Sequence, residues 1–120
     1  MGSKVAEAKE KQIVKEIVEK DYESAVLQGP LPVVLDFYST DSAPCTALAP
    51  RMGAVAEKFE GKIQFIKMLR QNNPGVAEKL GVTASPTLVF FKEGKEFGER
   101  LSGVDIKRTD LKARVEALMK

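Results

Sequence analysis

The residues of this chain best suited to chemistry lie in the stretch STDSAPCTALAP, residues 39–50, which holds the only cysteine, Cys45, three residues after Ser42. Disulfide exchange at such a turn uses two thiols, one that attacks and one that resolves. A single thiol can pack, be modified or hold one partner, but it cannot complete an internal dithiol cycle. It also excludes an internal disulfide and a disulfide-stapled secreted domain. One cysteine without any histidine argues against a zinc site.

Both residues also have a purely structural interpretation. A lone cysteine near the start of a helix is more often a buried, small apolar residue than a reactive group, so a poorly reactive Cys45 is favoured. Ser42 precedes a helical pattern, and serine is among the best helix N-caps, worth about 1 kcal/mol over alanine. The pattern therefore predicts that the Ser42 hydroxyl accepts a hydrogen bond from the first turn.

A carboxylate interrupts the apolar run VVLDFY, residues 33–38, which is typical of a strand buried on both faces. Because the residues on both sides of Asp36 are apolar, the pattern favours a buried carboxyl, and burial raises the pKa of such a group. The alternative is an edge strand on which Asp36 faces water.

Composition limits the classes of function. A chain of 120 residues with 43% hydrophobic and 30% charged residues fits one globular domain. A net charge of +2 is too slight to indicate a nucleic acid or an anionic membrane as partner. No apolar run reaches the roughly 20 residues that cross a bilayer. Residues 1–12 are expected to form a flexible lead-in without a signal core, residues 13–120 the domain, and the cytoplasm the compartment.

The elements that must position these residues follow from apolar periodicity and from the glycines and prolines. The run IVKEIV, residues 13–18, fits either a strand or a helix, and a short helix over 21–29 would begin at Asp21 as N-cap. A helix after Ser42 would carry Pro44 in its first turn and a kink at Pro50. The other expected elements are strands over 63–69 and 87–92, a hairpin strand over 96–101, and helices over 75–81 and roughly 106–119.

This order predicts an α/β domain, β-α-β-α-β-α-β-β-α, in which a central mixed β-sheet is flanked by helices on both faces. Strands that alternate with helices favour parallel pairing, and the hairpin adds antiparallel strands.

Four segments carry a resemblance to a known family: VVLDFYSTDSAPCTALAP, GKIQFIKM, QNNPGVAEKLGVTASPTLVFFKEGKE, and Gly103 after them. In order and spacing, over about residues 31–119, they resemble thioredoxin. The resemblance implies the thioredoxin fold, with Pro86 in the cis form beside the active-site loop. The backbone of Ser85 would then be open for pairing with a bound peptide strand.

The departure from the family lies in the motif itself. Thioredoxin-like redox sites have two cysteines separated by two residues, and here Ser42 takes the place of the attacking cysteine while Cys45 keeps that of the resolving one. A serine hydroxyl has no comparable acidity and forms no S–S bond. Asp41 replaces the tryptophan that usually precedes the motif. Either the serine is natural, or it replaces a cysteine of the parent protein, and the sequence leaves both interpretations open.

The resemblance also assigns roles to other residues. Asp36 would lie behind Cys45 and move its proton during resolution, and Lys67 would pair with Asp36. The alternative for Lys67 is a strand-end lysine with its ammonium in water. A shallow substrate groove would be formed by Asp41, Ala43, Pro44, Ser85, Pro86, Gly103 and Val104.

The leading hypothesis is a thioredoxin-like thiol–disulfide redox protein that is inactive or impaired as written. The resemblance implies disulfides in other proteins as substrates, a flavin-dependent reductase as electron source, no bound cofactor or metal, and a monomer. Two alternatives are a non-catalytic binding domain that uses the groove at Ser85 and Pro86, and an appended domain of a larger reductase.

Overall fold

The computed structural model describes residues 13–120, so the lead-in expected over residues 1–12 lies outside the described part. A mixed sheet forms the centre, with strand order β1-β3-β2-β4-β5 and β6 paired to β4. Its strands are β1 (Val14–Glu16), β2 (Val33–Tyr38), β3 (Gln64–Leu69), β4 (Thr87–Lys92), β5 (Lys95–Glu96) and β6 (Leu101–Ser102). The helices are α2 (Ala43–Lys58), α3 (Pro74–Leu80) and α4 (Arg108–Leu118).

The pairing directions confirm the mixed sheet. Strands β1, β3 and β2 are parallel, while β4 runs antiparallel to β2. The alternation of strands and helices favoured a parallel β4. However, β3 ends and β4 begins at the same edge of the sheet, since Leu69 lies opposite Tyr38 and Thr87 lies opposite Phe37, so β4 runs antiparallel. A turn at Glu93 and Gly94, both with positive φ (54° and 78°), then reverses the chain into β5.

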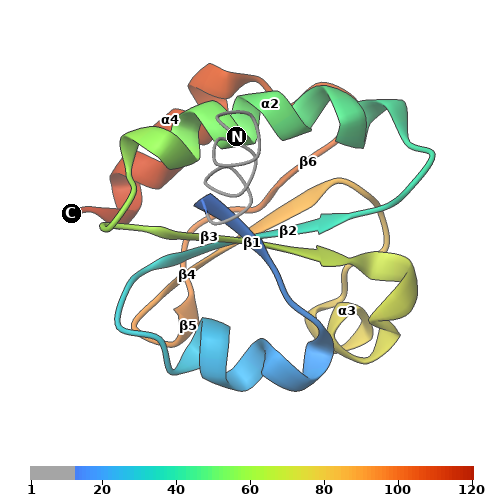
Figure 1. Cartoon of the computed structure of the whole chain (residues 1–120), viewed down its shortest axis with the longest axis horizontal. Helices are drawn as coiled ribbons and strands as arrows, with labels where there is room; N and C mark the ends of the chain where they lie inside the picture. The colour runs from blue at the N-terminus through green and yellow to red at the C-terminus, as the bar shows by residue number, and fades with distance from the viewer. Residues whose placement is uncertain (1–12) are drawn as a thin grey trace, which may run out of the picture.

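Alternation along the strands divides the core into two layers. One face of the sheet packs against the segment between β1 and β2 and against α3; its buried strand residues include Leu35, Phe37 and Ile66. The other face packs against α2 and α4 and includes Val34, Phe65 and Phe90. Figure 1 shows α2 and α4 together above the sheet, with α3 below it. Both faces are therefore covered, as expected for the thioredoxin fold.

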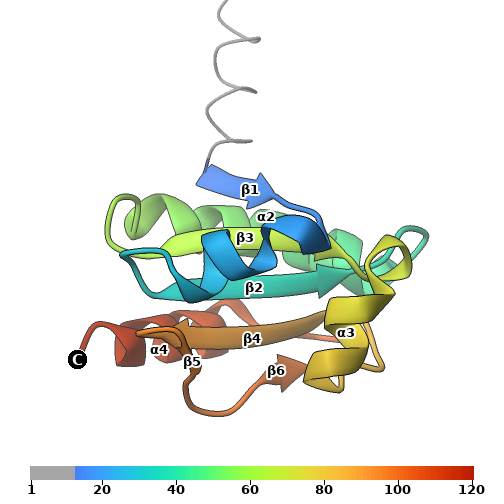
Figure 2. The ribbon, with the colours of Figure 1, turned by 90° about the horizontal axis from the view of Figure 1, so that it is seen from below.

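The segment from residue 13 to residue 29 differs from its expected form. Val14–Glu16 form a strand, which settles the choice between strand and helix in favour of an edge strand on β3 (Figure 2). The expected helix over 21–29 is instead a 3₁₀ turn, Glu19–Asp21, followed by a π-helical turn, Glu23–Leu27. Asp21 lies inside the first turn and caps nothing, so that prediction is wrong. The apolar positions Tyr22 and Val26 are nevertheless buried against the sheet.

A hairpin forms between β4 and β5, but the bounds expected for its second strand, 96–101, are wrong. Two strands of two residues each, β5 and β6, pair separately with β4, and residues 97–100 connect them. Short pairs of this kind leave no alternating pattern in the sequence. Helix α4 begins at Arg108 and packs Leu111, Val115 and Leu118 against the sheet.

Candidate active site

Strand register brings three separate loops to one edge of the sheet. Phe37 of β2 lies opposite Thr87 of β4, and Thr87 lies opposite Ser102 of β6. The residues that follow β2, precede β4 and follow β6 are therefore neighbours in space. They include Ser42, the Ser85–Pro86 pair and Gly103, which the resemblance placed in one site.

Ser42 is the N-cap of α2. Its φ and ψ of −120° and 115° are extended, and its Oγ accepts a hydrogen bond from the Cys45 N–H at 3.3 Å. Its carbonyl oxygen accepts from the Thr46 N–H at 3.0 Å, which begins the helical ladder. Asp41 before it has a φ of 57°, a left-handed conformation that aspartate tolerates better than most residues. The predicted N-cap is confirmed.

We expect Ser42→Ala to lower the free energy of unfolding by about 1 kcal/mol, because the first turn of α2 loses its side-chain acceptor. Urea denaturation monitored by circular dichroism measures this difference. Ser102→Ala is the matched control, since the Ser102 hydroxyl is exposed and makes no hydrogen bond within residues 13–120. Equal stability of the two variants would contradict a capping role.

Cys45 is a half-buried free thiol in the first turn of α2. Its Sγ accepts a hydrogen bond from the Ser39 N–H at 3.4 Å, which turns the sulfur toward the end of β2. Pro44 beside it is half-buried, while Ala43 is exposed. The backbone N–H of Ser39 thus holds the sulfur from the loop side.

Asp36 is buried beneath α2. Its residue is 8% exposed, which confirms the buried interpretation over the edge-strand alternative. Alternation on β2 places Asp36 on the same face as Val34, toward α2. Burial raises the pKa of the Asp36 carboxyl to about 7, and the positive charge of Lys67 offsets part of this rise. Its Oδ1 has no hydrogen-bond partner among the described residues.

Lys67 lies directly opposite Asp36 in the parallel register of β2 and β3. Within residues 13–120, however, no ion pair joins the two side chains, so the expected contact is not formed. The Lys67 Nζ instead lies 5.4 Å from the centre of the Tyr38 ring, a cation–π arrangement. Lys67 therefore influences Asp36 through its charge at longer range.

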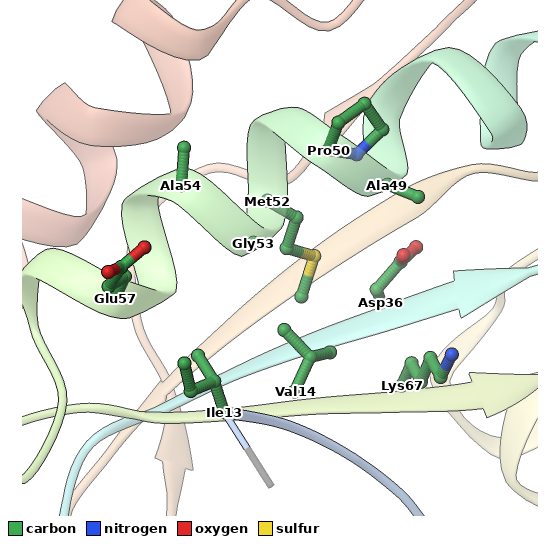
Figure 3. Close-up of a pocket in the computed structure, with 10 residues that line it drawn as sticks. All are labelled: Ile13, Val14, Asp36, Ala49, Pro50, Met52, Gly53, Ala54, Glu57 and Lys67. Carbon is green, nitrogen blue, oxygen red and sulfur yellow. The ribbon is translucent and has the colours of Figure 1, made fainter. Parts of the chain in front are cut away.

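A cavity of about 620 Å³ lies beside Asp36, between α2, β1 and β3. In Figure 3 the Asp36 carboxylate points from β2 toward α2, below Ala49 and Pro50, while Met52 extends from the helix toward the sheet. The walls are mainly apolar, and Asp36, Glu57 and Lys67 are the charged residues among them.

The peptide bond between Ser85 and Pro86 is cis. Pro86 is buried and Ser85 half-buried. The Ser85 backbone N–H and C=O have no partner within the described part of the chain, because the ladder between β4 and its neighbours begins at Thr87. Val104, next to Gly103 on the third loop, is 81% exposed.

Comparison with known proteins agrees with this geometry. The sequence model of the family named Thioredoxin matches residues 13–117. Thioredoxin 1 of Nostoc sp. is 33% identical over 81 residues, which cover 68% of this chain and 76% of the relative. Thioredoxin of Porphyra purpurea is 32% identical over 82 residues, 68% of this chain and 77% of the relative. Thioredoxin of Haemophilus influenzae is 34% identical over 79 residues, 66% and 74% of the two chains.

The chain belongs to the thioredoxin family. Its redox site is impaired as written, because a thiol–disulfide cycle needs two sulfurs and residue 42 is a serine. Among residues 13–120, no helix is both long and apolar enough to cross a bilayer.

Three residues at this thioredoxin-family site were not identified from the sequence. Arg70 and Gln71 follow β3: the Arg70 Nε donates to the Ser85 Oγ at 2.8 Å, and the Gln71 Oε1 accepts from the Thr40 N–H at 3.1 Å. They connect the loop before Pro86 and the loop before Ser42 to the end of β3. The only signal was their position directly after a strand.

Arg51 of α2 is the third residue. Its Nη1 donates to the Asp105 Oδ1 at 2.8 Å and to the Ile106 carbonyl oxygen at 2.9 Å. It thereby fixes the loop that carries Gly103 and Val104 to α2. No sequence pattern indicated this contact, because the partners are 54 and 55 residues away.

Proposed function

We propose that this chain is the scaffold of a protein disulfide reductase of the thioredoxin type, held inactive by Ser42. The observation that carries the proposal is the cap of α2. Ser42 and Cys45 occupy one helical turn, and the Cys45 N–H donates to the Ser42 Oγ at 3.3 Å, so a sulfur in place of that oxygen would lie in the same turn as the Cys45 thiol.

In the reaction, a thiolate at position 42 would attack one sulfur of the substrate disulfide and form a mixed disulfide, releasing one substrate thiolate. Cys45, after losing its proton, would attack the mixed disulfide and release the second substrate thiol. Two electrons pass to the substrate, and an internal disulfide remains. Ser42 cannot perform the first step, so Cys45 alone can hold one partner through a single mixed disulfide.

Asp36 is proposed to take the proton of Cys45 through the space beneath α2. A pKa of about 7 suits a group that must accept and release a proton near neutral pH. Lys67 is proposed to tune that pKa, since its charge favours the carboxylate form.

The groove beside the site is proposed to bind an extended segment of the partner. This proposal is supported by Ser85, next to Pro86. Its backbone N–H and C=O have no partner among the described residues and can pair with a strand of the partner. Asp41, Ala43 and Pro44 would form one wall, and Gly103 and Val104 the other. Asp41 makes this wall more polar than the family's tryptophan would.

The domain bounds, the compartment, the oligomeric state and the electron source are part of the same proposal. The acting unit is residues 13–120, preceded by a lead-in over 1–12, and it works as a cytoplasmic monomer without a bound cofactor. With a cysteine at position 42, it would carry electrons from a flavin-dependent reductase to disulfides in other proteins.

The experiment that tests the proposal is insulin reduction by the Ser42→Cys variant beside the chain as written. Reduction by the variant alone supports the redox function. Failure of the variant would contradict it and favour a non-catalytic binding domain.

A further inference from the structure

Arg70 places a positive charge next to the residue that precedes the cis-proline. It follows directly after β3, whose last residue Leu69 lies opposite Tyr38 of β2. Its Nε donates to the Ser85 Oγ at 2.8 Å. Arg70 is half-buried, and its bond to Ser85 places the guanidinium beside the groove proposed above.

No carboxylate neutralises this guanidinium within residues 13–120. The ion pairs of the described part involve Arg51, Arg100 and Arg114. The one side-chain hydrogen bond of Arg70 there goes to a neutral hydroxyl and uses only Nε, which leaves Nη1 and Nη2 for a ligand. Because Ser85 already fixes the guanidinium plane, binding would cost little further side-chain order.

A shallow hollow of about 510 Å³ adjoins Arg70. Pro74, Ala77 and Val82 supply apolar lining, and Gln71 and Glu78 add polar groups. Glu78 is the one acid on this lining; it is exposed and forms no ion pair with Arg70. The site thus combines a small apolar wall with a fixed cation, which fits the methylene and carboxylate groups of an acidic side chain.

We propose that Arg70 is a specificity-determining residue that binds a glutamate or aspartate side chain of the protein partner. This inference rests on the proposed use of the groove at Ser85. A partner segment that pairs with the Ser85 backbone brings its neighbouring side chains to the Arg70 guanidinium, which can bind a carboxylate with two parallel N–H···O bonds. The preferred partners carry an acidic residue within about two positions of the residue that lies beside Cys45.

The test is peptide binding to the chain as written, which needs no electron transfer. The probes are two eight-residue peptides that differ only in Glu against Gln two positions from a central serine, used in place of a partner cysteine. Dissociation constants come from NMR titration, with the Arg70 Nε–H and Ser85 N–H signals as local reporters. We expect the Glu peptide to bind about 5- to 10-fold more tightly, as for one charge-assisted contact, and less so at high salt.

Arg70→Gln is expected to remove the preference for Glu, while Arg108→Gln, which removes one exposed positive charge on α4, is expected to keep it. Ser85→Ala retains the charge but not its anchor, so the preference should fall without vanishing; this variant serves as a second test if Arg70→Gln does not fold. Equal binding of the two peptides, binding of neither, or a preference that survives Arg70→Gln would overturn the inference. Loss of insulin reduction in Ser42→Cys would instead count against the proposed redox function alone.

Discussion

Replacing Ser42 by cysteine is expected to raise the rate of insulin reduction by at least about 100-fold over the chain as written, because the attacking nucleophile is restored. The new thiolate would stand at the start of α2, where free N–H groups and the helix dipole favour negative charge. Cys45 already lies in the same turn with its N–H directed at the side chain of residue 42. Turbidity of insulin with dithiothreitol as reductant measures the rate.

Two variants separate this effect from the mere addition of a thiol. Ser39→Cys places a second sulfur near Cys45 but outside the cap, and it should stay at the level of the chain as written. Ser42→Cys combined with Cys45→Ser should form mixed disulfides without turnover. Comparable activity of the unaltered chain would contradict the assignment of residue 42 as the attacking position.

Asp36→Asn is expected to raise the free energy of unfolding at pH 8 by about 2–4 kcal/mol, since each tenfold difference in acid dissociation constant between the folded and unfolded states corresponds to about 1.4 kcal/mol. In the unfolded chain the carboxyl of Asp36 loses its proton near its ordinary pKa of 3.8, whereas the folded protein holds that proton until about pH 7. Between these values the native state binds more protons, so rising pH favours unfolding. The asparagine side chain does not titrate and avoids the cost of a buried charge.

The pH dependence distinguishes this mechanism from a general packing effect. At pH 4 the native carboxyl is already neutral, so the gain from Asp36→Asn should be small there. Urea denaturation at both pH values measures it, with Glu60→Gln as a control because Glu60 is exposed. The same gain at pH 4 and pH 8 would show that ionisation of Asp36 is not responsible.

The long elements could be predicted from sequence because burial on one or both faces leaves a pattern. The run VVLDFY became β2 with the predicted bounds, and TLVFFK became β4. The segment before β2 was harder, since Tyr22 and Val26 specify contact with the sheet but not the type of helical turn. Strands of two residues leave no pattern at all, which explains the error over 96–101.

The site was predictable where a single position decides the outcome. The apolar residues on both sides of Asp36 indicated that its side chain is buried. The serine before a helical pattern indicated that Ser42 caps α2. Contacts between distant residues were not predictable: Arg70 reaches Ser85 across 15 positions, and Gln71 reaches Thr40 across 31. Lys67 was correctly matched to Asp36 on the neighbouring strand. The position of its ammonium over the Tyr38 ring depends on side-chain conformation, which strand register does not determine.

The hydrogen bonds of Arg51 to Asp105 and Ile106 have a consequence for Val104, which precedes them and is 81% exposed. These contacts restrain the loop at Asp105 and Ile106 before any partner arrives. A partner that covers Val104 gains the burial of an apolar side chain while paying little conformational entropy on this side of the contact.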